Sequence, residues 1–433
     1  MKRTNVMLTI VVLLLILVPL ALLGCEKAEQ QPVKKSPVSA YKSKGAYTDL
    51  GDEKLSWANL EALPKKRAGM SPEEARQICV DFWHYVKGAL WIPDTQYDIY
   101  KEENGKSVYK RSVYAGQIYG GLPYVSNATG NIYRVLDFMD PETGVVNVTE
   151  AGIYPKIFGG MCSSGCYWAW ARVLNSANYS WTHEVVTKNG FIRVGPYTYD
   201  DHINRFSNEY GTHNVMEENG EQIMFASYAK LQLADGLGYS RNDGVGHIIM
   251  CTKEPVVDYN DDGTINGENS YILITDQGAI WQDGVSPNGL QYQYECSVDK
   301  KLTFAKLYES CYIPFTFADL LGTDPIEETE ISFSHTGETI TQKQLFSAKV
   351  NANYAISDIY VSVYDKDGNE IFKHAVRASV PATMELQVHK RMGHVYTWGD
   401  WENVNAGDTV KVEVQLGTGE RPMVYEGKLR VEN

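Results

Sequence analysis

The chain carries too little positive charge to bind nucleic acid. It has 40 lysines and arginines against 54 aspartates and glutamates, which gives a formal net charge of -14 at pH 7. A surface of this sign repels phosphates and cannot gain free energy by releasing counterions from a nucleic acid. We therefore exclude nucleic acid as a partner. The acidity alone indicates no other partner.

Cysteine and histidine are too sparse to indicate a metal site. The chain contains 7 cysteines and 9 histidines in 433 residues, and neither residue type shows the spacing of a zinc site or a disulfide scaffold. Segment 258–269 resembles a calcium loop, but Asn269 stands where such a loop needs a bidentate glutamate. A plain turn explains its Asp, Asn and Gly residues. We expect no metal, no cofactor and mostly free thiols.

The amino-terminal residues form a long apolar run. It extends from Val6 to Leu23 and is closed by Gly24 and Cys25. This ending resembles a lipobox, which implies a lipoprotein signal peptide over residues 1–24 and a mature chain that begins at a lipid-bearing Cys25. An uncleaved membrane-spanning anchor needs about 20 apolar residues and explains neither Gly24 nor Cys25. We therefore expect a lipid-anchored protein on the extracytoplasmic side of the cell membrane.

Composition divides the mature chain into three parts. Residues 25–67 are expected to form a flexible tether, because Lys, Gln, Ser and Pro dominate residues 26–44 without an apolar period. Residues 68–324 mix helical and strand patterns, and a capping box at Ser71 predicts a helix that ends near Gly88. Residues 325–433 contain short alternating segments, at a spacing typical of an immunoglobulin-like β-sandwich of about 100 residues. We expect a monomer of the α+β class whose last domain is a spacer or binding module.

Segment 158–173 is the most informative stretch for chemistry. A glycine turn leads into Cys162, and the residues that follow are apolar on nearly every side. This pattern predicts a buried helix that begins at a cysteine. A thiol at a helix amino terminus lies against the positive end of the helix dipole, which favours the nucleophilic thiolate. The unpaired N–H groups of the first turn are able to hold an oxyanion.

A thiolate nucleophile needs a base, and His247 is the candidate. It stands at the head of an apolar run, residues 247–251, that predicts a buried strand. The partner strand ends in Asp276 and Gln277, and either side chain could orient the imidazole. Because side chains alternate along a strand, only one of these two residues can face His247.

Three motifs in residues 71–322 resemble the NlpC family of papain-like cell-wall cysteine peptidases. Gly121-Leu122-Pro123-Tyr124 resembles the family's Gly-x-Pro-Tyr element, Met161-Cys162-Ser163 its Asp-Cys-Ser turn, and Gly246-His247-Ile248-Ile249 its Gly-His-Val strand. Thr275-Asp276-Gln277-Gly278 is similar to the Glu-Gln-Asn pattern of the related CHAP amidases.

The resemblance implies both a fold and an activity. It implies a papain-like domain in which Cys162 is the nucleophile, His247 the general base, and Asp276 or Gln277 the orienting group. Tyr124 and Ser163 would then contact the substrate. The implied activity is a thiol peptidase or amidase that hydrolyses peptide bonds of peptidoglycan stem peptides.

Alternatives remain for the thiol and for the function. Cys166 precedes an aromatic pair, as the nucleophile of papain does, and a disulfide between Cys162 and Cys166 would prevent nucleophilic catalysis. Met161 replaces the acidic residue that the family has before its cysteine, so the chain is a divergent relative. A non-catalytic binding lipoprotein on the same scaffold, or a thiol acyltransferase or lipid hydrolase, therefore competes with the peptidase.

Overall fold

The structure is a computed structural model that describes most of the chain after the predicted signal peptide and tether. It describes residues 49–50, 60, 63–103, 106–125, 131–149, 159–175, 191–200, 206–207, 209–241, 245–378, 385–388 and 394–430. The predicted signal peptide and Cys25 lie outside these residues. Within the predicted tether, Leu50 and Leu60 are each 1% exposed and Lys66 is 6% exposed, so these three residues are packed. No helix in the described ranges is long and apolar enough to cross a membrane.

Helix α3 (Pro72–Gly88) begins at the capping box that the sequence predicts. The Ser71 side chain accepts a hydrogen bond from the Glu74 backbone N–H, and the Glu74 side chain accepts one from the Ser71 N–H. These two bonds satisfy donors that have no partner inside the helix. The face that enters the core is apolar except for Arg76 and Lys87, which are also buried.

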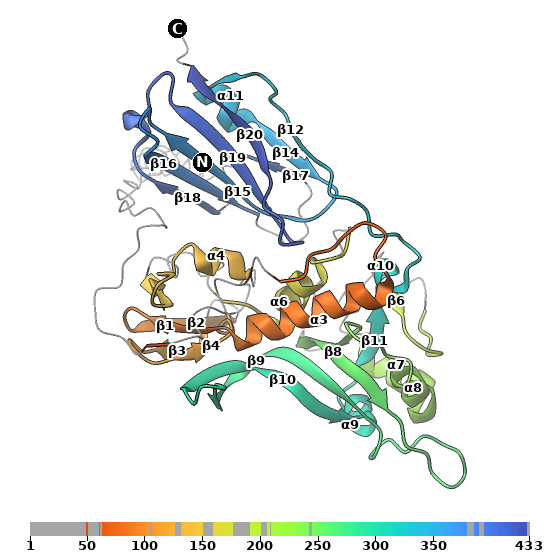
Figure 1. Ribbon diagram of the computed structural model, residues 1–433. Helices are drawn as coiled ribbons and strands as arrows, with labels where there is room; N and C mark the ends of the chain where they lie inside the picture. The colour runs from red at the N-terminus through yellow and green to blue at the C-terminus, as the bar shows by residue number, and fades with distance from the viewer. Residues whose placement is uncertain are drawn as a thin grey trace, which may run out of the picture. The chain divides into compact units, whose positions relative to one another are not determined.

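A nine-stranded mixed sheet forms the centre of the first part of the chain (Figure 1). Its order is β5-β1-β4-β10-β9-β8-β7-β11-β6. Strands β7, β8, β9 and β10 are antiparallel neighbours, which agrees with the strand pair predicted after Gly246. The strands are β1 (Leu90–Pro93), β4 (Tyr119–Gly120), β5 (Val145–Val146), β6 (Ile192–Arg193), β7 (Gly236–Ser240), β8 (Gly246–Val256), β9 (Tyr271–Val285), β10 (Gln291–Thr303) and β11 (Ile313–Thr316).

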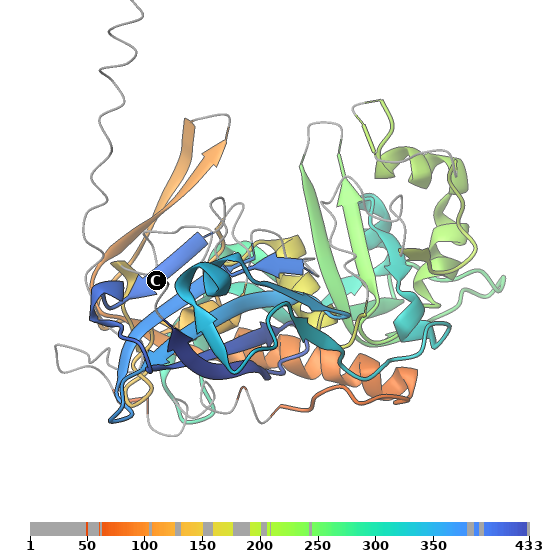
Figure 2. The same ribbon diagram turned by 90° about the horizontal axis from the view of Figure 1, so that it is seen from above.

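Helices and a separate hairpin surround this sheet. Helix α6 (Cys162–Trp170) contacts α3, β8 and β9, and α3 contacts β10, so α3 and α6 share one face of the sheet (Figure 1). Strands β2 (Tyr97–Glu103) and β3 (Lys106–Val113) form their own two-stranded sheet, the orange ribbon of Figure 2. The remaining helices are α4 (Ile132–Leu136), α7 (Thr212–Asn219), α8 (Glu221–Tyr228), α9 (Phe304–Glu309) and α10 (Ala318–Leu321).

Gly165 permits the close contact between α6 and α3. A Cβ atom on this residue would lie 2.5 Å from Cη2 of Trp83, a large side chain that is only 1% exposed. Such a distance is far inside van der Waals contact, and a packed core cannot absorb it without moving side chains or backbone. The spacing of the two helices therefore depends on a glycine at this position.

Gly165→Ala is expected to lower the free energy of unfolding by about 1–3 kcal/mol, because the added methyl group overpacks the core. Urea denaturation followed by circular dichroism measures the change. Gly88→Ala at the end of α3 is the matched control, since a Cβ atom there meets nothing within 4 Å. Equal stability of the two variants would contradict the packing argument.

Residues 331–430 form two further sheets, which we call the C-terminal two-sheet region. The sheets have the orders β12-β14-β17 and β13-β20-β19-β15-β16-β18, and residues of both contribute to one apolar core. The elements are β12 (Ile331–Phe333), β13 (Thr339–Thr341), α11 (Gln342–Ser347), β14 (Lys349–Ala352), β15 (Ile356–Tyr364), β16 (Glu370–Arg377), β17 (Glu385–Gln387), β18 (His394–Trp398), η5 (Trp401–Asn403), β19 (Thr409–Leu416) and β20 (Met423–Arg430). The chain as a whole is a mixed α and β protein, compatible with the α+β class that the sequence predicts.

Buried ions join helix α4 to the C-terminal two-sheet region. Arg134 Nε donates to Asp358 Oδ1 at 3.0 Å, and Arg377 Nη1 donates to the same oxygen at 3.0 Å. Arg377 also pairs with Asp137, which accepts a hydrogen bond from the Tyr360 hydroxyl at 3.0 Å. The side chains of both arginines and of Asp358 are 0% exposed. Charges this deeply buried are stable only while their partners remain in place.

Helix α6 also contacts this region. A Cβ atom on Gly417 would lie 2.8 Å from the Ala171 Cβ, just beyond the end of α6. A Cβ atom on Gly419 would overlap the guanidinium group of Arg172, which is 0% exposed. The turn between β19 and β20 therefore packs directly against the carboxyl-terminal end of α6.

Candidate active site

Cys162 is the first residue of helix α6, as the sequence predicts. The preceding residue, Met161, is the N-cap with extended backbone. Backbone N–H groups of Ser163 and Ile248 donate hydrogen bonds to the Cys162 sulfur. The residue is 5% exposed, so these bonds act in a partly dry environment where charge–dipole interactions are strong. The helix start and strand β8 thus hold the thiol from two sides.

His247 and Asp276 meet on adjacent strands of the sheet. His247 Nε2 lies 2.9 Å from Asp276 Oδ2, and the two side chains are 19% and 14% exposed. The other carboxylate oxygen accepts the Ser297 N–H at 2.8 Å, which fixes the carboxylate plane. Because Nε2 is engaged by Asp276, Nδ1 is the ring nitrogen left for the hydrogen bond between His247 and Cys162.

Gln277 is turned away from the imidazole. Its Nε2 donates to the carbonyl oxygens of Leu122 and Glu295, both at 2.9 Å. The sequence left open whether Asp276 or Gln277 faces His247, and side-chain alternation requires that only one does. In the structure it is Asp276 that contacts the histidine.

The three groups shift one another's pKa. Burial raises the pKa of the Cys162 thiol, but the charge of His247 and its hydrogen bond outweigh burial, so this pKa is lowered. Burial lowers the pKa of His247, yet the Cys162 thiolate and Asp276 raise it to about 10. Burial raises the pKa of Asp276, but the hydrogen bond to His247 and the positive charge of His247 outweigh burial, so this pKa is lowered. The arrangement favours a thiolate–imidazolium pair at neutral pH.

Cys166 lies one helical turn further along α6, and its pKa is shifted in the direction opposite to that of Cys162. It is 0% exposed, and its sulfur lies 3.9 Å from the Ile248 carbonyl oxygen. Burial, and then the nearby Cys162, raise its pKa well above the ordinary value, which disfavours a thiolate. All six cysteines of the described ranges are free, so the structure holds no disulfide between Cys162 and Cys166.

Of the two predicted substrate contacts, Ser163 follows the thiol directly in sequence, and Tyr124 pairs with the segment that leads to it. Tyr124 forms a parallel bridge with Gly160, two residues before Cys162, and its N–H donates to Glu295 Oε2 at 2.7 Å. Ser163 is 4% exposed in the first turn of α6, with its N–H on the Cys162 sulfur. The Tyr124 segment therefore runs alongside the turn that leads into Cys162.

Sequence reasoning missed three residues around this centre. The rings of Tyr239 and Tyr312 lie 5.0 Å apart, and the Tyr239 ring lies 6.4 Å from that of His247. Lys87 is 2% exposed and donates a hydrogen bond to Gln277, the residue after Asp276. A signal for Lys87 was present, because it follows Cys79 and Trp83 at helical spacing on the apolar face of α3.

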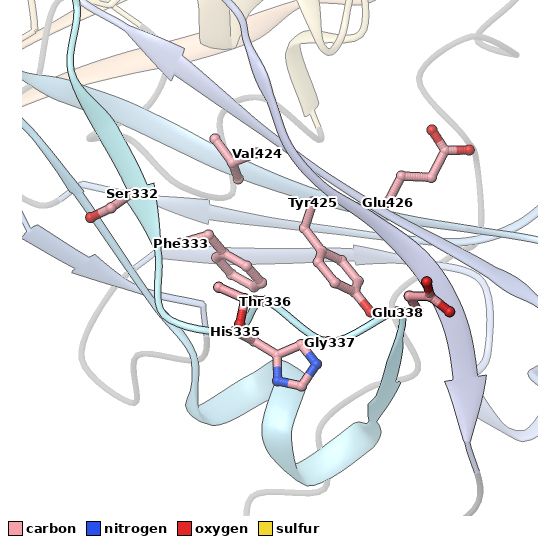
Figure 3. Close-up of a pocket in the computed structure, with 9 residues that line it drawn as sticks. All are labelled: Ser332, Phe333, His335, Thr336, Gly337, Glu338, Val424, Tyr425 and Glu426. Atoms are coloured by element: carbon pink, nitrogen blue, oxygen red, sulfur yellow. The ribbon is translucent and has the colours of Figure 1, made fainter.

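A separate pocket lies in the C-terminal two-sheet region. It is a shallow hollow of about 510 Å³ between β12, β20 and the loop after β12. Its floor is made by the Phe333 and Tyr425 rings, 5.5 Å apart, with His335 and Glu338 at its edge (Figure 3). Both floor rings are buried, at 7–8% exposure.

The described residues contain no candidate metal site, and the comparisons with protein families and curated proteins found no match. Among the described residues, no group of three or more His, Cys, Asp or Glu side chains is arranged to hold a metal ion. Comparison with protein-family models gives no match, and no curated protein matches the chain.

Proposed function

We propose that this protein is a lipid-anchored thiol peptidase or amidase that hydrolyses peptide bonds of peptidoglycan stem peptides. The observation that carries the proposal is the Cys162–His247–Asp276 arrangement at the start of α6. The motifs that resemble the NlpC family support a papain-like catalytic domain, and the strand pattern supports an immunoglobulin-like C-terminal domain. Cys25 supports an extracytoplasmic location, where peptidoglycan lies.

The mechanism follows from the roles of the three side chains. The Cys162 thiolate attacks the scissile carbonyl carbon, and the carbonyl oxygen becomes an oxyanion beside the first-turn N–H groups of α6. The His247 imidazolium gives its proton to the leaving amine as the C–N bond breaks. Water, deprotonated by neutral His247, then attacks the thioester and releases the acid and the thiolate. Asp276 orients the ring through both steps.

Two other functions fit parts of the same structure. The pocket of about 510 Å³ in the C-terminal two-sheet region favours a binding function for that region, so a non-catalytic binding lipoprotein is the second candidate. A thiol acyltransferase or lipid hydrolase would form an acyl-enzyme at the same cysteine. The acyltransferase would differ from the peptidase in the molecule that accepts the acyl group, and the lipid hydrolase would differ in the acyl group itself.

Hydrolysis of purified muropeptides, followed by mass spectrometry, tests the proposal. We expect products one water heavier in sum than the substrate, and no products after treatment with iodoacetamide. The rate should rise as Cys162 loses its proton, at a pH below the ordinary thiol value of about 8.5, and fall as His247 loses its proton near its pKa of about 10. Turnover that survives alkylation, or no turnover at any pH, would refute the proposal.

A further inference from the structure

Lys87 has a buried amino group that contacts Gln277, the residue after Asp276 of the proposed catalytic centre. It lies in the last turn of α3 and is 2% exposed. Its Nζ donates a hydrogen bond to Gln277 Oε1 and lies 3.9 Å from the centre of the Trp83 ring. Burying a lysine costs free energy, so a buried lysine needs neighbours that compensate. The proposed mechanism does not use it.

The hydrogen bond from Lys87 determines which way the Gln277 amide points. Since Oε1 accepts from the ammonium group, the amide nitrogen is directed at two carbonyl oxygens, those of Leu122 and Glu295, at 2.9 Å each. An amide with the opposite orientation would set its NH2 group against the ammonium and its oxygen against the carbonyls. Lys87 therefore selects the one orientation that supports Leu122.

The segment after Leu122 leads to the nucleophile turn. The Pro123 carbonyl accepts the Gly160 N–H at 2.9 Å, and the Gly160 carbonyl accepts the Val125 N–H at 3.0 Å. Gly160 is two residues before Cys162. A shift of the 122–125 segment would thus be transmitted to the thiol and to Tyr124, the expected substrate contact, through a short series of hydrogen bonds.

The charge of Lys87 also acts on the centre. Burial is the largest effect and lowers the pKa of Lys87, although the neighbouring thiols and Asp276 act in the opposite direction. The attraction is mutual, so a protonated Lys87 favours the charged forms of Asp276 and Cys162. The titratable groups that act on Lys87 come from three elements that pack around it. They are Cys296 on β10, Cys166 and Cys162 on α6, and Asp276 on β9.

We propose that Lys87 is a positioning residue of the thiol site, which through Gln277 holds the 122–125 segment against the nucleophile turn and whose positive charge favours the Cys162 thiolate. The inference rests on the proposed thiol chemistry. The proposal has two components, the hydrogen-bond chain through Gln277 and the effect of the Lys87 charge on Cys162. The charge component does not depend on the identity of the substrate.

Lys87→Met tests the proposal, because methionine keeps the apolar stem and removes the charge. We measure the rate of Cys162 alkylation by iodoacetamide against pH, with the site identified by peptide mass spectrometry. At pH 7 the rate should fall about fivefold to tenfold, and the rise of the profile should move to higher pH. The acid side of the muropeptide pH–rate profile should move with it.

Lys66→Met is the matched control. Lys66 is also buried and lies 4.0 Å from the centre of an aromatic ring, that of Tyr354, but it bonds to the Glu327 carbonyl oxygen. Its replacement should leave the Cys162 alkylation profile unchanged. A purely structural effect of losing a buried lysine would slow both variants alike.

Gln277→Met separates the two components and remains available if Lys87→Met does not fold. It keeps the lysine and breaks the hydrogen-bond chain to Leu122, so the KM for muropeptides should rise while the alkylation profile moves less than in Lys87→Met. An alkylation profile identical to the wild type in Lys87→Met, or an unchanged KM in Gln277→Met, would overturn the corresponding component. If the wild type alkylates normally yet releases no product, the proposed function fails, and the alkylation profiles still test whether the charge of Lys87 acts on Cys162.

Discussion

Cys162→Ala is expected to reduce muropeptide hydrolysis by about 10⁴-fold or more, because the acyl-enzyme pathway needs a sulfur nucleophile. Neighbouring groups cannot replace it. Cys166 is 0% exposed and has a raised pKa, and His247 alone can only activate water. The measurement is the initial rate of product release under saturating substrate, with mass spectrometry to identify the bond that is cleaved.

Cys166→Ala is the control for this prediction. The two cysteines lie in the same helix, and both substitutions remove one buried sulfur, so a general loss of packing would affect both variants. We expect Cys166→Ala to retain hydrolysis and Cys162→Ala to lose it. The reverse result would identify Cys166 as the nucleophile, and equal activity of Cys162→Ala and wild type would exclude a thiol mechanism at this position.

The sequence was enough to select residues of the candidate site, but not to predict which of their side chains contact one another. The residues Cys162 and His247 could be selected because a helix start and a strand head are visible in local patterns. The choice between Asp276 and Gln277 could not be made, because it depends on which face of β9 turns toward β8. That face is set by the pairing of the strands, which local patterns do not encode.

Lys87 shows why the surroundings of the site were not predicted. Its place on the apolar stripe of α3 was visible, but a lysine at such a position usually extends its amino group to solvent. Here the side chain is 2% exposed, and Gln277 of β9 supplies an acceptor inside the core. Contacts between segments about 190 positions apart decide this outcome.

The fold was predicted where one local signal dominated. The capping box at Ser71 gave the start of α3, and alternating residues gave most strands of the C-terminal two-sheet region. The sequence of segment 345–350 also favours a strand, but helix α11 (Gln342–Ser347) occupies its first half. The Thr341 side chain and the Gln344 side chain form a capping box there, and this signal outweighed the short apolar run.

Asp358 holds two buried cations at the contact between α4 and the C-terminal two-sheet region. It accepts from Arg134 and from Arg377 at 3.0 Å each, and the charge of Arg134 followed by that of Arg377 overcomes its burial to lower its pKa. Tyr360 and Ala375 of the same region belong to the apolar core that surrounds the nine-stranded sheet. The contact thus combines charge and apolar burial, and we expect the described parts of the chain to unfold together.

Asp358→Ala is expected to lower the free energy of unfolding by about 3–5 kcal/mol, because it leaves Arg134 and Arg377 buried without their shared counterion. Glu385→Ala removes the carboxylate of an exposed pair with Lys349, whose side chains are 51% and 55% exposed, and should cost about 0–1 kcal/mol. Urea unfolding followed by far-ultraviolet circular dichroism and by tryptophan fluorescence gives both values. In the wild type the two probes should report one transition. Two separate transitions, or a loss in Asp358→Ala no larger than in Glu385→Ala, would contradict the expectation that the C-terminal two-sheet region and the nine-stranded sheet unfold together.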